Sequence, residues 1–396
     1  MVEVCNLFRI GKEELEAVTR VMESGYLFKI NDGLQEAINA EKEMCEIFGV
    51  DNTIFMTSGY GALTSALVAM GIGPGDEVIV PAFTYIATAM AVVAAGAMPV
   101  IAEIDETLTI SPEDIEKKIS SHTKAILPVH ILGCPCNMDA IMDIANKHGL
   151  VVLEDACQSV GGKFHGKRLG AIGTTGALSF NFFKLISCGE GGALLVNDRD
   201  LFEKAFIYQD SSAIEFFGNQ MDGINTKLFC GDEYRSNELA AAILRVQLKR
   251  MDGILDDLRK NRDYIVNAVS DLCEIVPCHD PDGECAVKVA FRFDSEAKAR
   301  AFARSEGVHG VVALDIDKNV YRTWKAIMNK RGALHPLMDP FKMEANKDIV
   351  PDYHPDMCPQ SIDILSRTAY ININPDMSKE RMDAKIEYIR KALSNL

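Results

Sequence analysis

Residues 178–192 read LSFNFFKLISCGEGG, and the rest of the chain can be interpreted around this stretch. One lysine, Lys184, stands among aromatic and small apolar residues, and the stretch ends in a Gly-Glu-Gly-Gly turn. An amine in apolar surroundings is desolvated, which disfavours the ammonium and makes the neutral nucleophile more available. Lys184 is therefore a candidate for Schiff-base chemistry with a carbonyl compound.

A carboxylate follows an apolar segment upstream of this lysine. Residues 151–155 read VVLED, which predicts a buried strand that presents Asp155 at its C-terminal end. A lysine Schiff base and an aspartate facing a pyridinium nitrogen are the minimal equipment for pyridoxal 5′-phosphate (PLP). The alternative, a Lys184 that only extends its amine out of a core, requires these features to coincide by chance.

A glycine-rich turn lies between a predicted strand and a predicted helix in residues 54–63, IFMTSGYGAL. Free amides at a helix N-terminus bind anions, and a phosphate fits there, although the glycines equally suit a simple tight turn. Tyr85 follows the next predicted strand, at 78–80, where it could stack on a planar ring. A rim aromatic of the core is an equally good interpretation of that residue.

Short apolar runs alternate with helical patterns along the first 250 residues, which favours a mostly parallel sheet with crossover helices. Residues 237–269 form one long helical pattern, and we place a domain boundary within it. The predicted domains are residues 1–250, large and α/β, and residues 251–396, smaller and α+β. Residues 319–359, rich in Pro, Met and His, are expected to be irregular.

The composition narrows the class of protein. The chain has 396 residues and a net charge of -16, which argues against nucleic acid or an anionic membrane as a partner. It has no apolar run of membrane-spanning length and no signal-peptide pattern at its start. Eleven cysteines without a framework fit a reducing cytoplasm, and a Cys134-Pro135-Cys136 run without a second ligand pair is a poor zinc motif.

Several motifs together resemble the DegT/DnrJ/EryC1/StrS family of PLP-dependent sugar aminotransferases. They are TSG at 57–59, GPGDEVIVP at 73–81, EDACQ at 154–158, SF at 179–180, Lys184, and GEGG at 189–192. Each motif alone is weak, but their shared order and spacing cover nearly the whole chain. The resemblance implies the three-layer α/β/α architecture of PLP fold type I, with a smaller C-terminal domain.

The resemblance also implies roles for individual residues. Lys184 would form the Schiff base and carry the proton, while Asp155 would keep the pyridine nitrogen protonated. Gln158 would bond the cofactor's phenolic oxygen, and Tyr85 would stack on its ring. The phosphate would be held by the amides of Gly59, Tyr60 and Gly61 and by the Ser179 hydroxyl. A homodimer with shared active sites is also implied. Lys184 further favours transamination, because the dehydratase branch of the family has a histidine at this position.

Two positions depart from the family pattern. Tyr60 stands where the family often has a small residue, so a phosphate contact there would be through the backbone only. Glu233, in the run GDEYR at 231–235, stands where the family commonly has an asparagine that reaches a neighbour's phosphate. A carboxylate would repel a phosphate dianion, so we do not transfer that contact.

The substrates are expected to be an amino-acid donor, L-glutamate, and a keto-sugar acceptor. Phe28, Lys29 and the cationic run KRGALHP at 330–336, with His335, could meet an acidic acceptor, although a cluster of charges is more often a solvated face. The specific prediction is 8-keto-3,8-dideoxy-manno-octulosonate, which would give 8-amino-3,8-dideoxy-manno-octulosonate (Kdo8N) for lipopolysaccharide. The alternatives are a nucleotide-linked keto sugar, a keto cyclitol, or a non-enzymatic PLP-binding regulator.

Overall fold

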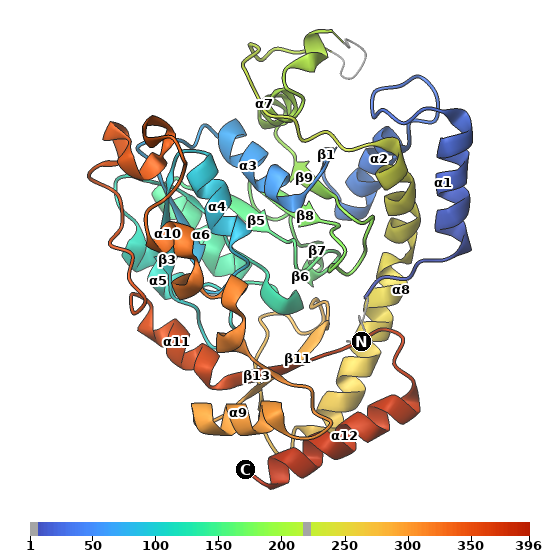
Figure 1. Cartoon of the computed structure of the whole chain (residues 1–396), viewed down its shortest axis with the longest axis vertical. Coiled ribbons are helices and arrows are strands. Elements are labelled where there is room, and N and C mark those ends of the chain that lie inside the picture. Colours follow the sequence, from blue (N-terminus) through green and yellow to red (C-terminus); the bar gives the residue numbers. More distant parts are fainter. Residues whose placement is uncertain (1–6, 217–222) are drawn as a thin grey trace.

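The computed structural model describes residues 7–216 and 223–396, and Figure 1 shows the whole chain. A seven-stranded sheet is built in the order β1-β9-β8-β5-β4-β2-β3. Its strands are β1 (Asn52–Met56), β2 (Glu77–Pro81), β3 (Met98–Ala102), β4 (Thr123–Ile126), β5 (Val151–Asp155), β8 (Thr175–Ser179) and β9 (Gly192–Val196). Of these, β9 pairs antiparallel with both β1 and β8, while the remaining neighbours pair in parallel. All strands except β9 therefore end at the same edge of the sheet.

Twelve helices are assigned in the described chain. They are α1 (Lys12–Ser24), α2 (Glu36–Phe48), α3 (Gly59–Ala69), α4 (Ala87–Ala94), α5 (Pro112–Lys118), α6 (Met138–His148), α7 (Arg199–Gln209), α8 (Glu238–Val269), α9 (Glu296–Arg304), α10 (Lys325–Met328), α11 (Pro359–Ser366) and α12 (Lys379–Ser394). Many begin after a Ser, Asn or Asp whose side chain accepts a backbone N–H of the first turn. These caps are Ser58, Ser111, Asn137, Asp198, Asn237, Ser295 and Ser378.

The strands alternate their side chains between two cores, one on each face of the sheet. Ile54 and Met56 pack on one face with α3, α4 and α7, whereas Phe55 packs on the other with α2, α6 and α8. This alternation is the period of two that a strand imposes. Helices thus cover both faces, and the mostly parallel three-layer fold predicted from the sequence is confirmed.

A second, antiparallel sheet follows α8 in the chain. It has the order β10-β11-β13-β12, with β10 (Glu274–Ile275), β11 (Lys288–Arg292), β12 (Val311–Val312) and β13 (Thr368–Asn372). A separate hairpin pairs β6 (Lys163–Phe164) with β7 (Lys167–Arg168). Figure 1 shows α8 running from the large sheet to the smaller one, so a single helix passes through residue 250. The domain boundary placed there stays a prediction.

The connection between β12 and β13 is largely irregular, as its composition predicts. Residues 313–346 form short 3₁₀ turns around the single-turn helix α10. Across residues 7–216 and 223–396, no helix combines the length and the hydropathy required to cross a membrane.

Candidate active site

A cavity of about 700 Å³ opens at the edge where the parallel strands end. Its lining includes most of the residues selected from the sequence, namely Gly59, Tyr60, Tyr85, Asp155, Gln158, Ser179 and Lys184. These residues come from loops and strand ends that are far apart in the chain. Their convergence follows from the topology, because the carboxyl ends of parallel strands meet at one edge of the sheet.

Lys184 lies in the loop that joins β8 to β9. The loop is closed by backbone hydrogen bonds, from Phe182 N–H to Gly189 O (2.9 Å) and from Cys188 N–H to Phe180 O (3.1 Å). The Lys184 N–H donates to the Asn181 carbonyl over 2.9 Å. This bracing holds the partly buried Lys184 at the cavity wall, as a covalent attachment point requires.

Asp155 ends β5 and is only 4% exposed. One carboxylate oxygen accepts the Thr88 hydroxyl over 2.8 Å, and the other accepts the Cys157 N–H over 3.1 Å. Both donors fix the orientation of the carboxylate. Burial, together with the charge of Asp155, raises the pKa of the neighbouring Cys157 thiol, so that thiol stays neutral.

The glycine-rich turn leaves two backbone donors without a protein acceptor. Ser58 caps α3 and accepts the Gly61 N–H over 3.0 Å, so that amide is already engaged. The amides of Gly59 and Tyr60 meet no acceptor among the residues that the structure describes. The backbone of the turn packs so closely on β9 that a Cβ at Gly192 would lie 2.2 Å from the Ser58 carbonyl carbon.

The donor set fits PLP. Free amides at a helix N-terminus, with the Ser179 hydroxyl nearby in the same lining, suit a phosphate. The fixed carboxylate of Asp155 suits a protonated ring nitrogen, and Lys184 supplies the amine. Tyr85, 45% exposed, and Gln158 complete the lining that the sequence predicts.

Three predicted substrate residues lie outside this cavity. Lys29 is buried, and its amine contacts a Glu41 carboxylate oxygen over 2.6 Å and the Phe55 carbonyl over 3.1 Å. Phe28 is 44% exposed and packs against the Arg235 guanidinium, whose carbon lies 5.3 Å from the ring centroid. His335 accepts the Leu337 N–H in an exposed 3₁₀ turn. The cationic run 330–336 therefore does not line the cavity.

Glu233, the departure from the family pattern, is engaged elsewhere. Its carboxylate pairs with the Arg235 guanidinium over 2.5 Å, and the Ser211 hydroxyl donates to it over 3.3 Å. Glu233 is absent from the cavity lining of this chain. Its negative charge is offset locally by Arg235.

Several lining residues had no sequence pattern to identify them. Thr88 contacts Asp155 across 67 residues of chain, and Lys288, Lys318 and Tyr370 come from beyond α8. A lone threonine or lysine carries no motif. A signal was available only in Lys288, whose charge directly precedes the apolar residues Val289, Ala290 and Phe291 of its strand.

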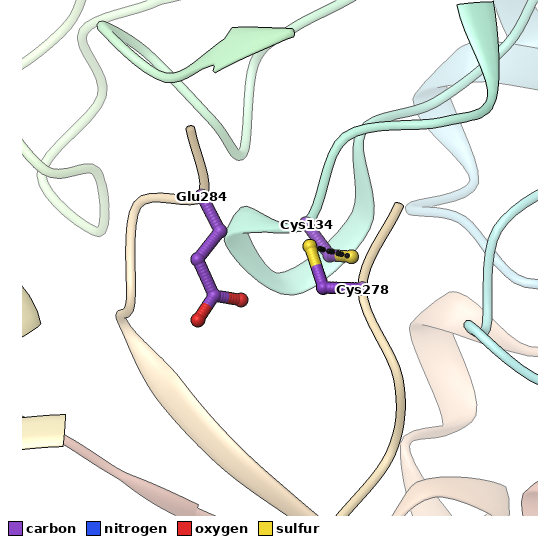
Figure 2. Close-up of side chains that lie close together, drawn as sticks. All are labelled: Cys134, Cys278 and Glu284. Carbon is purple, nitrogen blue, oxygen red and sulfur yellow. Dashed lines mark hydrogen bonds between the residues drawn. The ribbon is translucent and has the colours of Figure 1, made fainter. Parts of the chain in front are cut away.

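The two thiols of the C-x-C run take different partners. Cys136 is buried against the Val129 carbonyl, whereas Cys134 lies 2.9 Å from Cys278 in sulfur–sulfur distance, beside Glu284 (Figure 2). Two thiolates on one tetrahedral zinc stand about 3.7 Å apart, given Zn–S bonds of about 2.3 Å. Glu284 is already ion-paired with Arg262. The trio is therefore a thiol pair beside an ion pair, and we assign no metal to it.

A model of the DegT/DnrJ/EryC1/StrS aminotransferase family matches residues 9–390. The chain belongs to this family. It is a PLP-dependent aminotransferase. The family assignment accounts for the cavity, in which an amine, a buried carboxylate and an anion-binding turn meet.

The names of similar proteins refer to a polysaccharide and to nucleotide-linked sugars. The spore coat polysaccharide biosynthesis protein SpsC of Bacillus subtilis is 33% identical over 392 residues, which is 96% of this chain and 94% of SpsC. GDP-perosamine synthase of Caulobacter vibrioides is 38% identical over 62% of this chain and 64% of that protein. The dTDP-3-amino-3,4,6-trideoxy-alpha-D-glucose transaminase of Streptomyces venezuelae is 38% identical over 60% of each.

Solved structures of family members share the fold over nearly the full length. The aminotransferase of Psychrobacter cryohalolentis superposes with a TM-score of 0.80, at 27% identity over 98% of both chains. S. venezuelae DesV, solved with a ketimine intermediate, gives 0.74 at 26% identity, over 97% of this chain and 95% of DesV.

Proposed function

We propose that this aminotransferase moves an amino group from L-glutamate to a keto sugar, with Lys184 and Asp155 as its catalytic residues. The single observation that carries the proposal is the cavity in which Lys184, Asp155 and the free amides of Gly59 and Tyr60 converge. When bound, PLP supplies an electron sink for the carbon that carries the amino group. The remaining steps belong to side chains of this chain.

The side chains would divide the work as follows. The Lys184 amine would hold the cofactor and, when free, would accept and return a proton as a general base and acid. Asp155, oriented by Thr88 and the Cys157 amide, would pair with the ring nitrogen. The Gly59 and Tyr60 amides and the Ser179 hydroxyl bind the phosphate. Tyr85 and Gln158 orient the ring.

For the acceptor, we propose a free keto sugar acid, with 8-keto-3,8-dideoxy-manno-octulosonate as the specific candidate and Kdo8N as its product. Its support is the presence in the cavity wall of two further lysines, Lys288 and Lys318. A nucleotide-linked keto sugar is the second candidate, and the names of two similar relatives favour it.

The test is an absorbance spectrum of the purified protein with PLP, before and after addition of L-glutamate, for the wild type and Lys184→Ala. We expect a visible band that glutamate converts in the wild type only. A wild-type protein without such a band would refute the proposal. A band that glutamate leaves unchanged would refute glutamate as donor.

The acceptor is identified in the second half-reaction. The amino form of the holoenzyme is mixed with the 8-keto sugar acid or with a nucleotide-linked keto sugar, and return of the original band is followed. Return with the sugar acid only would support the first candidate, and return with the nucleotide sugar only would select the second.

A further inference from the structure

The chain beyond α8 contributes two cations to the cavity wall. Lys288 opens β11, and Lys318 lies in the 3₁₀ turn Asp317–Asn319. In β11, Val289 and Phe291 are buried in the core, so strand alternation turns Lys288 toward the opposite face. The four-stranded sheet thereby delivers a lysine to the cavity that holds Lys184.

Lys288 is partly buried and lacks an anionic partner. Its amine lies 3.9 Å from the centroid of the Tyr370 ring. Within residues 7–216 and 223–396, no carboxylate lies within 4.0 Å of either the Lys288 or the Lys318 amine. An aromatic face attracts a cation, but it does not replace oxygen acceptors for the three N–H donors of an ammonium.

The chain itself provides a comparison. Lys29 is buried, and its amine is paired with the Glu41 carboxylate and the Phe55 carbonyl. Because a buried charge is costly unless it is paired, a lysine that serves only the fold is expected to look like Lys29. Lys288 differs from Lys29 because it has no carboxylate partner, and a bound ligand could supply one. It faces a cavity that is large enough to hold such a ligand.

The local charge balance favours an incoming anion. The Lys318 amine lies 5.8 Å from the Tyr85 ring centroid and 5.6 Å from that of Phe183, at the cavity mouth. Burial, together with the charge of Lys318, lowers the pKa of Lys288 to about 7. Of the carboxylates in the lining, Asp155 is engaged by Thr88, and Glu190 accepts the Asn181 amide over 2.9 Å.

We propose that Lys288 and Lys318 form a subsite that binds an anionic group, a carboxylate or a phosphate, of a substrate in this cavity. The inference rests on the proposed function, because it takes the cavity as the place where both substrates bind. Two substrates can bring the group. One is the amino-acid donor through its carboxylate, and the other is the acceptor through an acid group.

The experiment compares the PLP-loaded wild type with Lys288→Met, Lys288→Arg and, as a control, Lys249→Met at an exposed position of α8. Apparent affinities are measured by absorbance for L-glutamate, 2-oxoglutarate and the 8-keto sugar acid. In parallel, succinate, a dicarboxylate that cannot react, is titrated by its effect on the thermal unfolding midpoint.

We expect Lys288→Met to weaken at least one of these ligands about tenfold or more, with limiting rates changed much less. Lys288→Arg should recover most of the affinity, and Lys249→Met should behave as the wild type. Weakening of glutamate and 2-oxoglutarate alone would assign the subsite to the donor. Weakening of the keto acid alone would assign it to the acceptor.

Two outcomes would overturn the subsite. In one, Lys288→Met binds succinate, glutamate and the keto acid as the wild type does. In the other, Lys288→Met loses the cofactor band at PLP concentrations that saturate the wild type. Lys288 would then bind an anionic group of the cofactor and not of a substrate. The two proposals can also fail separately. If glutamate leaves the cofactor band unchanged but succinate still stabilises the wild type and not Lys288→Met, the subsite is supported and glutamate is refuted as the donor.

Discussion

At the scale of single residues, the candidate site depends on the hydrogen-bond partners of its charged side chains. Asp155 has two donors from different elements, Thr88 of α4 and the backbone of Cys157. Glu154, next to it in the sequence, is fully buried and has a structural role. Its carboxylate accepts the amides of Gly170, Ile172 and Gly173 and contacts His130 over 3.0 Å. Adjacent acids thus face different surroundings on opposite faces of one strand, and only Asp155 lines the cavity.

Removing the Thr88 hydroxyl should impair catalysis more than stability. In Thr88→Val, one oxygen of the buried Asp155 carboxylate loses its hydrogen-bond donor, so the orientation of the carboxylate is less fixed. We expect the rate of the glutamate half-reaction to fall about tenfold, measured by stopped-flow absorbance. Thr368→Val in β13 is the control, because the buried Thr368 hydroxyl donates to the Ile364 carbonyl and Thr368 does not line the cavity. Equal rates in the wild type and Thr88→Val would contradict this role.

The lowered pKa of Lys288 gives stability a predictable pH dependence. Its usual value of 10.5 is lowered to about 7 in the fold, so between these values the unfolded chain holds a proton that the native state has lost. Stability contributed by this residue therefore rises with pH from about 7 to about 10, by at most about 1.4 kcal/mol per pH unit.

The measurement is the free energy of unfolding in urea at pH 7, 8 and 9 for the wild type and Lys288→Met. The wild type should gain stability relative to the variant as pH rises, and the variant should be the more stable protein at pH 7. A difference that does not vary with pH would contradict the lowered pKa.

At the scale of elements, the glycine-rich turn between β1 and α3 depends on close contact between strands and helix. β1 pairs with β9 in a register that places Met56 opposite Gly192, and the turn after β1 packs onto that glycine. Lys184 lies in the loop that follows the neighbouring strand β8 and leads into β9. The pairing of β8 with β9 therefore places the lysine beside the turn.

Gly192→Ala should destabilise the protein and weaken PLP binding, because its Cβ would lie 2.2 Å from the Ser58 backbone. We expect a loss of about 2 kcal/mol or more in the free energy of unfolding, since backbone must move. Gly253→Ala is the matched control. Its Cβ meets nothing within 4 Å on α8, and it should stabilise by about 0.5–1 kcal/mol. Chemical denaturation measures the free energy of unfolding of each variant, and PLP titration measures its affinity for the cofactor. Equal values for the two variants would contradict the packing argument.

At the scale of the whole molecule, the cavity joins residues from both sheets and opens beside exposed apolar side chains. Phe183 is 74% exposed, and Tyr85 and Phe182 are also exposed at this mouth. Such a cluster beside a ligand site is typical of an interface. It is consistent with the homodimer that the family resemblance implies, which stays a prediction.

We expect light scattering to give twice the mass of one chain. Phe183→Ser should shift the protein toward the monomer and weaken PLP binding, because the exposed ring would otherwise be buried against the second copy. Leu272→Ser, which changes an exposed apolar residue after α8, is the control. A monomeric wild type that binds PLP fully would contradict the prediction.

The amino-acid sequence by itself determined the fold class and predicted the centre of the candidate site. Lys184, Asp155 and the turn at Gly59 lie in local patterns, and the order of strands and helices decides which strand ends share an edge. Only the tertiary structure decided which isolated side chains reach the cavity. Thr88, Lys288 and Lys318 arrive there, whereas Phe28, Lys29 and His335 do not. The physical reason is that a lone side chain acquires its surroundings from elements distant in sequence. The amine of Lys29 is paired with Glu41, whereas the amine of Lys288 lies over the Tyr370 ring without a carboxylate partner.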